Sequence, residues 1–516
     1  MSKIILEKNI PFSQSSMWHD QKKYYNQKGI DAWEEDVPFY ITSNPFIAKQ
    51  YAEVIIRFIQ DWSRNNPDTT HKLFYILELG SGTGQFSFYL LKNIVALQEA
   101  LNLTSISIRY VMSDITVQSF AFWEKQVQLQ PYLTSGMLDF ALYDLYHGGE
   151  FILHRAQKTI SEKEIHHPLI IIANYIFDSI ATDVFTVVDG KLFESRVTIQ
   201  TEDGNVIAGV PKEWEKIEIV HTPHEINNTY YNDALDPILF QYQRELIDTH
   251  FQFPVASLKA LQQLQKLSHH QFLLLTSDKG YSCLDELDNC DYPELDFHGS
   301  FSVMVNFHAI GEFLKQSGGH YQLQSFRDNI VTGVFSSGFS LNSLSETALS
   351  IQKMIRGFSP TDYFLVYEYF IEHYKSCTLE LMAAYLNLSA WDPYVFDHIS
   401  DRFCELAEEG DPEVISFLSD HMMEIANNFY FSPGVNDIFF DIALFFQNTG
   451  RFLRAMEYYH LSQHYFGQDD VVLFNIAMCL YNVDRQTEAL EYLRSAQALN
   501  PSAIDVQEWI DIIIKK

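Results

Sequence analysis

Between residues 73 and about 340, short apolar runs alternate with amphipathic stretches in which apolar residues recur at helical spacing. The runs are rich in Ile, Val, Leu and Phe, which favour buried β-strands. Strands that alternate with helices in this way form an open, largely parallel sheet with helices on both faces. The pattern therefore predicts an α/β domain. Its predicted strands are FYILEL, IRYVMSD, LDFALYD, PLIIIAN, VFTVVD and FLLLTSD.

Two further regions flank this domain. Residues 1–70 form an aromatic, mostly helical lead, since apolar residues from Ile47 to Ile59 follow helical spacing. After the Ser- and Gly-rich stretch GVFSSGFSLNSLSET the strand signal fades, and helical periodicity continues to the end. We therefore predict three domains: a helical lead or cap at 1–70, the α/β domain at 71–340 with a helical insertion at about 212–268, and an all-α domain at 350–516.

The all-α region contains an internal repeat with a period of 34 residues. Small residues recur where two antiparallel helices must approach closely. The matched positions are Ile442-Ala443 with Ile476-Ala477, Ala455 with Ala489, and Tyr458 with Tyr492. The pattern resembles the tetratricopeptide repeat and is clearest at 436–501, whereas a generic helical domain is the alternative. The resemblance implies stacked helix pairs that present a binding surface for a protein.

Composition and charge exclude several classes of function. The chain has 516 residues, of which 47% are hydrophobic and 15% aromatic, as in a packed globular protein. Its formal net charge of -32 argues against binding to nucleic acid, which requires Lys and Arg to displace counterions. The longest apolar stretch, 169–188, is interrupted by Asn174, Asp178 and Asp183, which argues against a membrane span. Scattered cysteines and the lack of an export signal predict a cytoplasmic protein without a metal site.

A glycine-rich elbow, ILELGSGTG, follows the first predicted strand. Glu78 ends the strand, and Gly80, Gly82 and Gly84 precede a predicted helix. The elbow lacks the Lys-Ser/Thr ending of a nucleoside-triphosphate loop and the last glycine of the dinucleotide fingerprint. Bare backbone beside a carboxylate suits a ligand that carries a positive charge. The alternative is a tight turn without a ligand.

This elbow resembles motif I of class I methyltransferases, which have a Rossmann-like sheet and bind S-adenosyl-L-methionine. The resemblance implies that the segment Gly80, Ser81, Gly82, Thr83 and Gly84 borders the methionyl part of the cofactor and that Glu78 orients its ammonium group. It also implies that Asp114, which ends the second predicted strand, holds the ribose hydroxyls. Asp144, which ends the third, is placed to meet the adenine amino group. An exposed carboxylate at a strand end is the alternative for Asp144.

The fourth predicted strand and the residues after it, PLIIIANYIFDSIATDVF, resemble NEFFDALPVD of the MidA-like family, which includes mitochondrial complex I assembly arginine methyltransferases. The likeness covers about residues 37–340. It implies an acceptor site that contains Asn174, Tyr175 and Asp178, with Asp178 receiving the acceptor's proton. An N-cap for the next helix is an equally good use of Asp178. Tyr175 replaces the family's Glu, so arginine as the acceptor is an expectation that lysine, a terminal amine or a side-chain amide could replace.

These resemblances lead to three hypotheses. The first is an S-adenosylmethionine-dependent methyltransferase that modifies a protein, which the repeats and the acidic surface recruit. The second is an interaction scaffold that keeps the fold without catalysis. The third is a small-molecule methyltransferase whose repeats form a homo-oligomer. The fold alone does not distinguish them.

Overall fold

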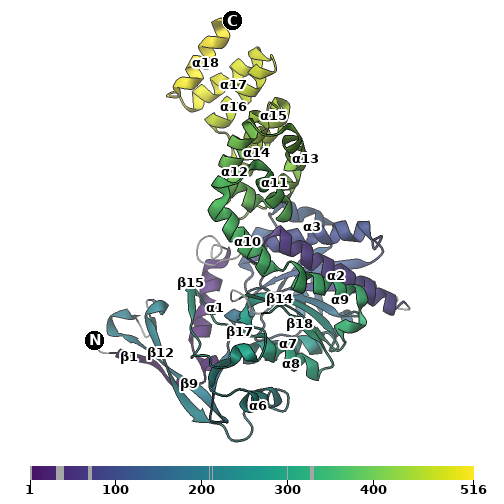
Figure 1. The fold of residues 1–516 in the computed structure, drawn as a ribbon, viewed down its shortest axis with the longest axis vertical. Helices are drawn as coiled ribbons and strands as arrows, with labels where there is room; N and C mark the ends of the chain where they lie inside the picture. The colour runs from purple at the N-terminus through teal and green to yellow at the C-terminus, as the bar shows by residue number, and fades with distance from the viewer. Residues whose placement is uncertain are drawn as a thin grey trace. The chain divides into compact units, whose positions relative to one another are not determined.

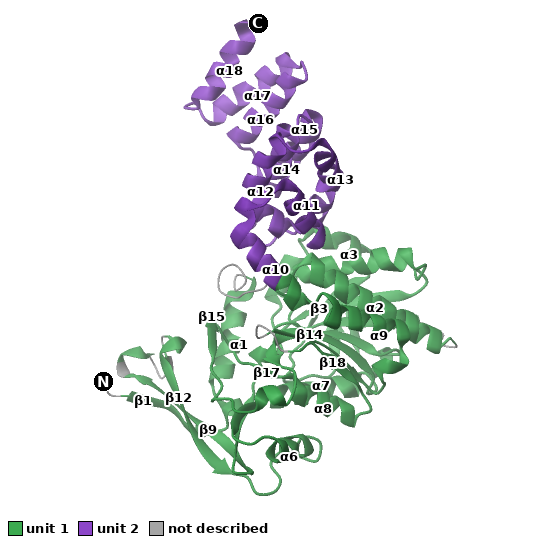
Figure 2. Ribbon diagram, viewed as in Figure 1, with its two compact units in different colours: residues 1–364 green, residues 365–516 purple. Residues whose placement is uncertain are grey.

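The chain forms two compact units, residues 1–364 and 365–516, which Figure 2 shows in green and purple. The structure is a computed structural model, and it describes residues 3–30, 40–67, 72–207, 210–211, 213–298, 300–325 and 330–515. Among these residues, none of the helices has the length and apolar character needed to cross a membrane.

A twisted, mostly parallel sheet is the core of the first unit (Figure 1). Its strands are β2 (Leu73–Glu78), β3 (Ser107–Asp114), β4 (Leu138–Leu142), β7 (Leu169–Ile172), β14 (Phe272–Tyr281), β18 (Tyr321–Leu323) and β19 (Ile330–Ser337), with the short β17 (Val305–Asn306) beside β14. The order across the sheet is β18-β19-β14-β7-β2-β3-β4, and β19 alone runs antiparallel to its neighbours on both sides. This order confirms the predicted α/β, class I methyltransferase-like sheet. The direction of winding reverses between β2 and β7, which marks the topological switch point.

Helices cover both faces of this sheet, which explains its apolar strands. All four residues of β7 and all eight of β19 are buried. Figure 1 shows α2, α3 and α9 on one side of the sheet and α7 and α8 on the other. These helices are α2 (Pro45–Asn65), α3 (Gln85–Ala100), α7 (Val255–Leu267), α8 (Phe307–Gln316) and α9 (Ser345–Gln352). A strand with both faces covered reads as a continuous apolar run, which is why the sequence reveals it.

A second, antiparallel sheet corrects two predictions. Its strands are β1 (Lys3–Ile10), β8 (Asp183–Val188), β9 (Lys191–Glu202), β12 (Ile217–Glu225) and β13 (Thr249–Phe253). The lead therefore begins with a strand, followed by α1 (Met17–Lys28) and α2. The insertion at about 212–268 likewise combines β12 and β13 with α6 (Asp236–Glu245) and α7, so it is not purely helical. Both β1 and β12 pair along the long strand β9, and this tertiary pairing overrides weak local propensity.

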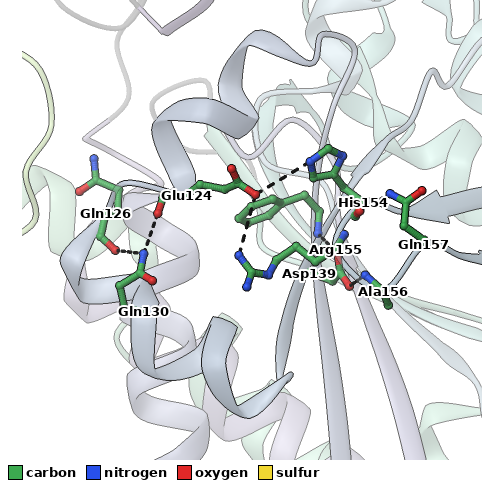
Figure 3. Close-up of polar contacts among 9 residues, drawn as sticks. Glu124, Gln126, Gln130, Asp139, His154, Arg155, Ala156 and Gln157 are labelled. Atoms are coloured by element: carbon green, nitrogen blue, oxygen red, sulfur yellow. Dashed lines mark hydrogen bonds and ion pairs between the residues drawn. The ribbon is translucent and has the colours of Figure 1, made fainter.

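A buried carboxylate fixes the outer edge of the main sheet. Asp139, near the start of β4, is 1% exposed and accepts N–H bonds from Phe140 (2.8 Å), Arg155 (2.8 Å) and Ala156 (3.1 Å) (Figure 3). Arg155 and Ala156 form the turn between β5 (Phe151–Leu153) and β6 (Lys158–Ile160). Glu124 lies 3.8 Å from the Arg155 guanidinium. These bonds hold the β5–β6 hairpin beside β4, which covers an edge that would otherwise be unpaired.

The second unit is helical throughout its described secondary structure, which confirms the expected all-α region. It begins within α10 (Pro360–His373) and continues through α11 (Leu379–Leu388), α12 (Pro393–Glu408), α13 (Pro412–Asn428), α14 (Ile438–Asn448), α15 (Phe452–Phe466), α16 (Asp470–Asn482), α17 (Gln486–Leu499) and α18 (Ile504–Lys515). Helix α14 packs on α15 and α16 on α17, and the alanines Ala443, Ala455, Ala477 and Ala489 are fully buried. Identity as tetratricopeptide repeats stays a prediction.

The division between the units falls later than the predicted boundary at 340–350. Helix α9 belongs to the first unit because it packs on α2. Thr347 donates both its backbone N–H and its hydroxyl to the buried carboxylate of Asp61, at 2.8 Å each. The ring of Tyr363 also stacks on Phe46 at 4.5 Å. The Ser- and Gly-rich stretch, 333–347, therefore lies within the first unit, where it contains the end of β19, a short turn and the start of α9, and it is not a linker between the units.

Candidate active site

The glycine elbow lies at the carboxyl end of β2, at the switch point of the sheet. Gly80, Gly82 and Gly84 have φ values of +63°, +52° and +82°, in the left-handed region that favours glycine. Backbone hydrogen bonds join the elbow to the strands on both sides. Leu79 N–H donates to the Ile172 carbonyl of β7 and Ser81 N–H to the Ser113 carbonyl of β3, both at 2.9 Å. A methyl group at Gly80 would approach the Ile176 side chain to 2.5 Å. The sequence thus selects glycine here for backbone conformation and for space.

Two side chains outside the cavity lining form hydrogen bonds with the elbow and stabilise it. Glu78 is buried, and one of its oxygens accepts hydroxyl bonds from Ser81 (2.9 Å), Tyr110 (2.8 Å) and Ser87. Burial raises the pKa of Glu78, while the three hydroxyl bonds oppose that rise. Trp123, from the helix after β3, donates its indole N–H to the Gly82 carbonyl at 2.9 Å. Glu78 therefore supports the elbow from within.

A cavity opens beside the elbow, with an empty volume of about 1020 Å3 including its mouth. It brings together Gly80, Gly82, Asp114, Asp144, Asn174 and Tyr175 of the predicted site residues. Among the described residues, the lining does not include Glu78, Ser81, Thr83, Gly84 or Asp178. Glu78 supports the loop from outside the lining, and its role in orienting the ammonium group of the cofactor, directly or through water, stays a prediction. The carboxyl ends of parallel strands meet at this edge, which explains why residues far apart in sequence converge here.

Asp114 is the carboxylate best placed to hold a ligand in this cavity. One of its oxygens accepts a bond from the Ser119 hydroxyl at 2.8 Å, and the other a longer bond of 3.3 Å from Thr116 N–H. Burial raises the pKa of Asp114, and these bonds act against the rise. A carboxylate oriented by local donors and facing a cavity can accept two hydroxyl bonds from one ligand.

Asp144 lines the cavity but is already engaged. Its oxygens accept bonds from Tyr146 N–H (3.0 Å) and from the His147 ring (2.9 Å), and Lys22 lies at 2.5 Å. Burial raises the pKa of Asp144, but its bonds with Lys22, Tyr146 and His147 together lower it below its ordinary value. Lys22 belongs to α1, which also lines the cavity with Trp18, Gln21 and Tyr25. Nothing in the sequence of α1 had indicated this role.

The predicted acceptor-side residues follow β7 and are held by β14. The Asn174 side-chain oxygen accepts bonds from the Tyr51 hydroxyl and from Ser277 N–H, both at 3.0 Å. Tyr175 has a φ of +52°, which is rare for a bulky residue, and its hydroxyl is buried without a hydrogen-bond partner among the residues that the structure describes. Strained backbone and an unpaired buried hydroxyl are features that concentrate at functional sites.

Asp178 does not cap a regular helix, but it meets a second carboxyl group. It lies in a short 3-10 turn, is 3% exposed, and donates its backbone N–H to the side chain of Asp278, from β14, at 3.2 Å. Asp278 is fully buried. The sequence did carry a signal for Asp278, because the predicted strand FLLLTSD ends in a carboxylate as the strands that end in Asp114 and Asp144 do. The described part of the chain contains no cluster of three or more His, Cys, Asp or Glu that could hold a metal ion.

Comparisons with known proteins yield only weak structural likenesses. No family model and no curated protein matches the chain. A protein of Burkholderia thailandensis solved with S-adenosyl-homocysteine is 12% identical, with a TM-score of 0.41, over 64% of this chain and 88% of that one. The DhpI complex with S-adenosyl-homocysteine (8%, TM-score 0.25) covers 63% of this chain and 98% of that one. Loganic acid methyltransferase (11%, TM-score 0.23) covers 67% and 85%. The strand order, and not these likenesses, therefore identifies the fold.

Proposed function

We propose that this protein is an S-adenosylmethionine-dependent methyltransferase that modifies a protein side chain. One observation carries the proposal: left-handed glycines at the switch point and the carboxylate of Asp114, on the next strand, face a single cavity. Nucleoside-type ligands bind at this position in open α/β sheets. Gly80 and Gly82 line the cavity with bare backbone in the left-handed region, where a side chain would be strained.

The residues present fit this cofactor. Asp114 would accept the ribose hydroxyls, and Gly80 and Gly82 would border the methionyl part, whose ammonium group is attracted by carbonyl and carboxylate oxygens. The bound cofactor supplies an activated methyl group. The chain's own contribution is to align the acceptor with that methyl group and to exclude water, which accounts for much of catalysis in a simple displacement.

A protein acceptor is supported by the second unit. Several large apolar side chains are exposed on its helices, including Tyr369 (66%), Met423 (61%), Leu453 (61%) and Ile504 (73%). These side chains lie on four different helices, α10, α13, α15 and α18, so the support for a protein partner comes from the stacked helix pairs, which present an extended surface. Arginine is the first acceptor to test, because of the resemblance of 168–185 to arginine methyltransferases, and lysine is the next.

Two measurements test the proposal. Calorimetric titration with S-adenosyl-homocysteine should show binding that Asp114→Ala weakens at least about tenfold, since a charge-assisted pair of bonds is lost. Transfer of tritium from labelled S-adenosylmethionine into a cell extract, resolved by size, should then label a protein band. Removal of residues 374–516 should reduce this labelling without changing cofactor affinity. Wild-type protein that binds no cofactor would favour the scaffold hypothesis, and label found only in small molecules would favour the third.

A further inference from the structure

A second cavity lies next to the one that contains the glycine elbow. Its empty volume is about 850 Å3 including its mouth. Leu145 and Tyr146 line both cavities, and of two consecutive residues Ile180 lines the first and Ala181 the second. The loop after β4 and the turn before β8 therefore form a wall, residues 145–146 and 180–181, that the two cavities share.

Hydrogen bonds hold this shared wall in place. Ala181 N–H donates to the Tyr146 hydroxyl at 2.9 Å, which joins the turn to the loop. Tyr146 N–H donates to the Asp144 carboxylate at 3.0 Å, and Asp144 lines the first cavity. Ala256 N–H, at the start of α7, donates to the Ala181 carbonyl at 3.2 Å. The shared wall is thus joined to a lining residue of each cavity.

The second cavity carries a positive charge. Lys259, on α7, is exposed and is the one charged side chain among the described lining residues. Its ammonium group has no ion-pair or hydrogen-bond partner in the part of the chain that the structure describes, whereas Lys22 of the first cavity is paired with Asp144. The chain has 67 acidic and 35 basic residues, so an unpaired lysine at a cavity is a local exception to the negative charge. It favours a ligand group that is negatively charged.

Side-chain amides accompany this lysine. Gln262 and Gln263 follow Lys259 by three and four residues, on the same face of α7, and both line the second cavity. Gln14, in the turn after β1, lines it as well. One ammonium and several amide N–H donors match a carboxylate, which carries a single charge and accepts several hydrogen bonds. A phosphate group carries about -1.5 to -2 and would leave part of its charge uncompensated here.

The first cavity contains an unsatisfied donor close in sequence to the shared wall. Tyr143, two residues before Leu145, lines the first cavity and is 4% exposed. Its hydroxyl is buried and has no hydrogen-bond partner among the described residues. Burial raises the pKa of this phenol, so the hydroxyl stays neutral and able to donate. A buried hydroxyl without a partner is costly, and a ligand oxygen would remove that cost.

We propose that the two cavities together bind an acidic peptide segment of the acceptor protein, with a carboxylate against Lys259 in the second cavity and a backbone carbonyl against the Tyr143 hydroxyl in the first. This inference rests on the proposed function, in which the residue to be methylated reaches the cofactor in the first cavity. A peptide fits both contacts, because it carries a neutral carbonyl at every residue and a carboxylate at Asp or Glu. The acceptor sequence therefore contains Asp or Glu near the methylated residue.

The test uses full-length protein and two isosteric probes, the N-acetylated and N-methylamidated dipeptides Gly-Asp and Gly-Asn. They have the same backbone carbonyls and differ in one charge. Ligand-observed NMR titration measures the affinity of each, with and without saturating S-adenosyl-homocysteine. We expect the Gly-Asp peptide to bind about fivefold more tightly at low salt, as for an exposed ion pair, and added sodium chloride to reduce this preference. Inorganic phosphate, the third probe, should displace the Gly-Asp peptide no better than acetate does.

Two variants separate the two contacts. Lys259→Gln should bind both peptides equally, because it removes the charge that distinguishes them. Lys266→Gln is its control and should keep the preference, since Lys266 lies on the same helix but is not among the described lining residues.

Tyr143→Phe should weaken both peptides by about threefold to tenfold and keep the preference, because only the contact with the carbonyl is lost. Tyr75→Phe is its control. Tyr75 is buried in the same apolar cluster and is not among the described lining residues, so this variant should change neither affinity.

The outcomes separate this inference from the proposed function. Equal binding of the two peptides by wild type, a preference that survives in Lys259→Gln, or displacement by phosphate that exceeds that by acetate would overturn the carboxylate site even if the cofactor binds. Unchanged peptide affinity in Tyr143→Phe would overturn the contact in the first cavity. A preference that Lys259→Gln removes, in a protein that does not bind S-adenosyl-homocysteine, would support the carboxylate site and overturn the methyltransferase.

Discussion

Asp278 and Asp139 are both buried aspartates of the main sheet. Asp278 lies near the carboxyl end of β14, and Asp139 lies near the start of β4. Each is almost wholly buried, and each accepts three backbone N–H bonds, one of them from the next residue in the chain. They differ in their surroundings. Asp139 fixes a hairpin at the edge strand β4 and lies 3.5 Å from the Arg109 guanidinium, whereas Asp278 accepts the N–H of Asp178, whose neighbour Ser179 lines the cavity. The two carboxylates thus share their backbone donors but differ in the charge beside them, since Asp139 has a guanidinium partner and Asp278 has the carboxyl group of Asp178 nearby.

Glycines with left-handed backbone also occur both at the cavity and away from it. Left-handed glycines line the cavity edge at Gly80 and Gly82, and Gly136 occupies a left-handed position before β4 at the opposite edge. A methyl group at Gly136 would have only the Arg109 guanidinium, at 3.8 Å, within reach. The two edges thus offer matched positions at which the local cost of a substitution can be separated from its effect on a ligand.

The largest effect is expected at Gly82. Gly82→Val should weaken binding of S-adenosyl-homocysteine at least about 100-fold, because a β-branched residue resists left-handed φ and its side chain would occupy the cavity wall. Gly136→Val carries similar backbone strain and should lower the melting temperature but leave affinity within about twofold. Calorimetry and thermal unfolding measure the two effects. Equal affinity loss in both variants would mean that global destabilisation, and not the cavity, explains the result.

The sequence predicted features that depend on local patterns and missed those that depend on contacts between distant segments. The central strands, the glycine elbow and the carboxylates Asp114 and Asp144 that end predicted strands are local patterns, and local patterns are visible in a sequence. The β1–β9–β12 pairing and the role of α1 at the cavity depend on contacts between distant segments, so the sequence did not reveal them. Asp278 is an intermediate case. The sequence shows that a predicted strand ends at Asp278, but it does not show that Asp178 lies beside it.

The next effect concerns stability. We expect Asp178→Asn and Asp139→Asn to change the free energy of unfolding in opposite directions. A raised native pKa for Asp178, about 6, means that wild-type stability is present in full near pH 4 and falls as pH rises through 6. Asp178→Asn removes this cost, so it should raise the free energy of unfolding above pH 7 by about 2 to 3 kcal/mol relative to wild type. The advantage should shrink towards pH 4.

Asp139→Asn should instead destabilise by about 1 to 3 kcal/mol, since an amide cannot accept all three N–H bonds and leaves donors unpaired. Urea unfolding of both variants across pH 4 to 8 measures these effects. Destabilisation by Asp178→Asn at every pH would contradict the view that the carboxyl group of Asp178 is kept for function at the expense of stability.

A smaller effect is expected at Trp123, the brace of the elbow. Trp123→Phe keeps a ring in the buried cluster but loses the bond to the Gly82 carbonyl, which should cost about 1 kcal/mol of cofactor binding, roughly five- to tenfold. Phe120→Leu, in the ring that packs on Trp123, changes the same cluster without touching the elbow. It should lower stability but not affinity. An affinity loss that Phe120→Leu reproduces would show that packing, and not the hydrogen bond, holds the elbow.

The smallest effect tests whether Asp144 takes part in binding at all. Lys22 and His147 engage the Asp144 carboxylate, so a ligand amino group could reach it only by displacing one of them. Lys22→Met removes the stronger competitor, and because ion pairs with partial exposure contribute about 0.2 to 1 kcal/mol, affinity for S-adenosyl-homocysteine should rise by about two- to fivefold. Lys23→Met, which removes the exposed Lys23–Asp20 pair on the same helix, should have no effect on calorimetric affinity. Weaker binding in Lys22→Met would reverse the interpretation, since it would mean that Lys22 itself contacts the cofactor and that Asp144 positions Lys22 for that contact.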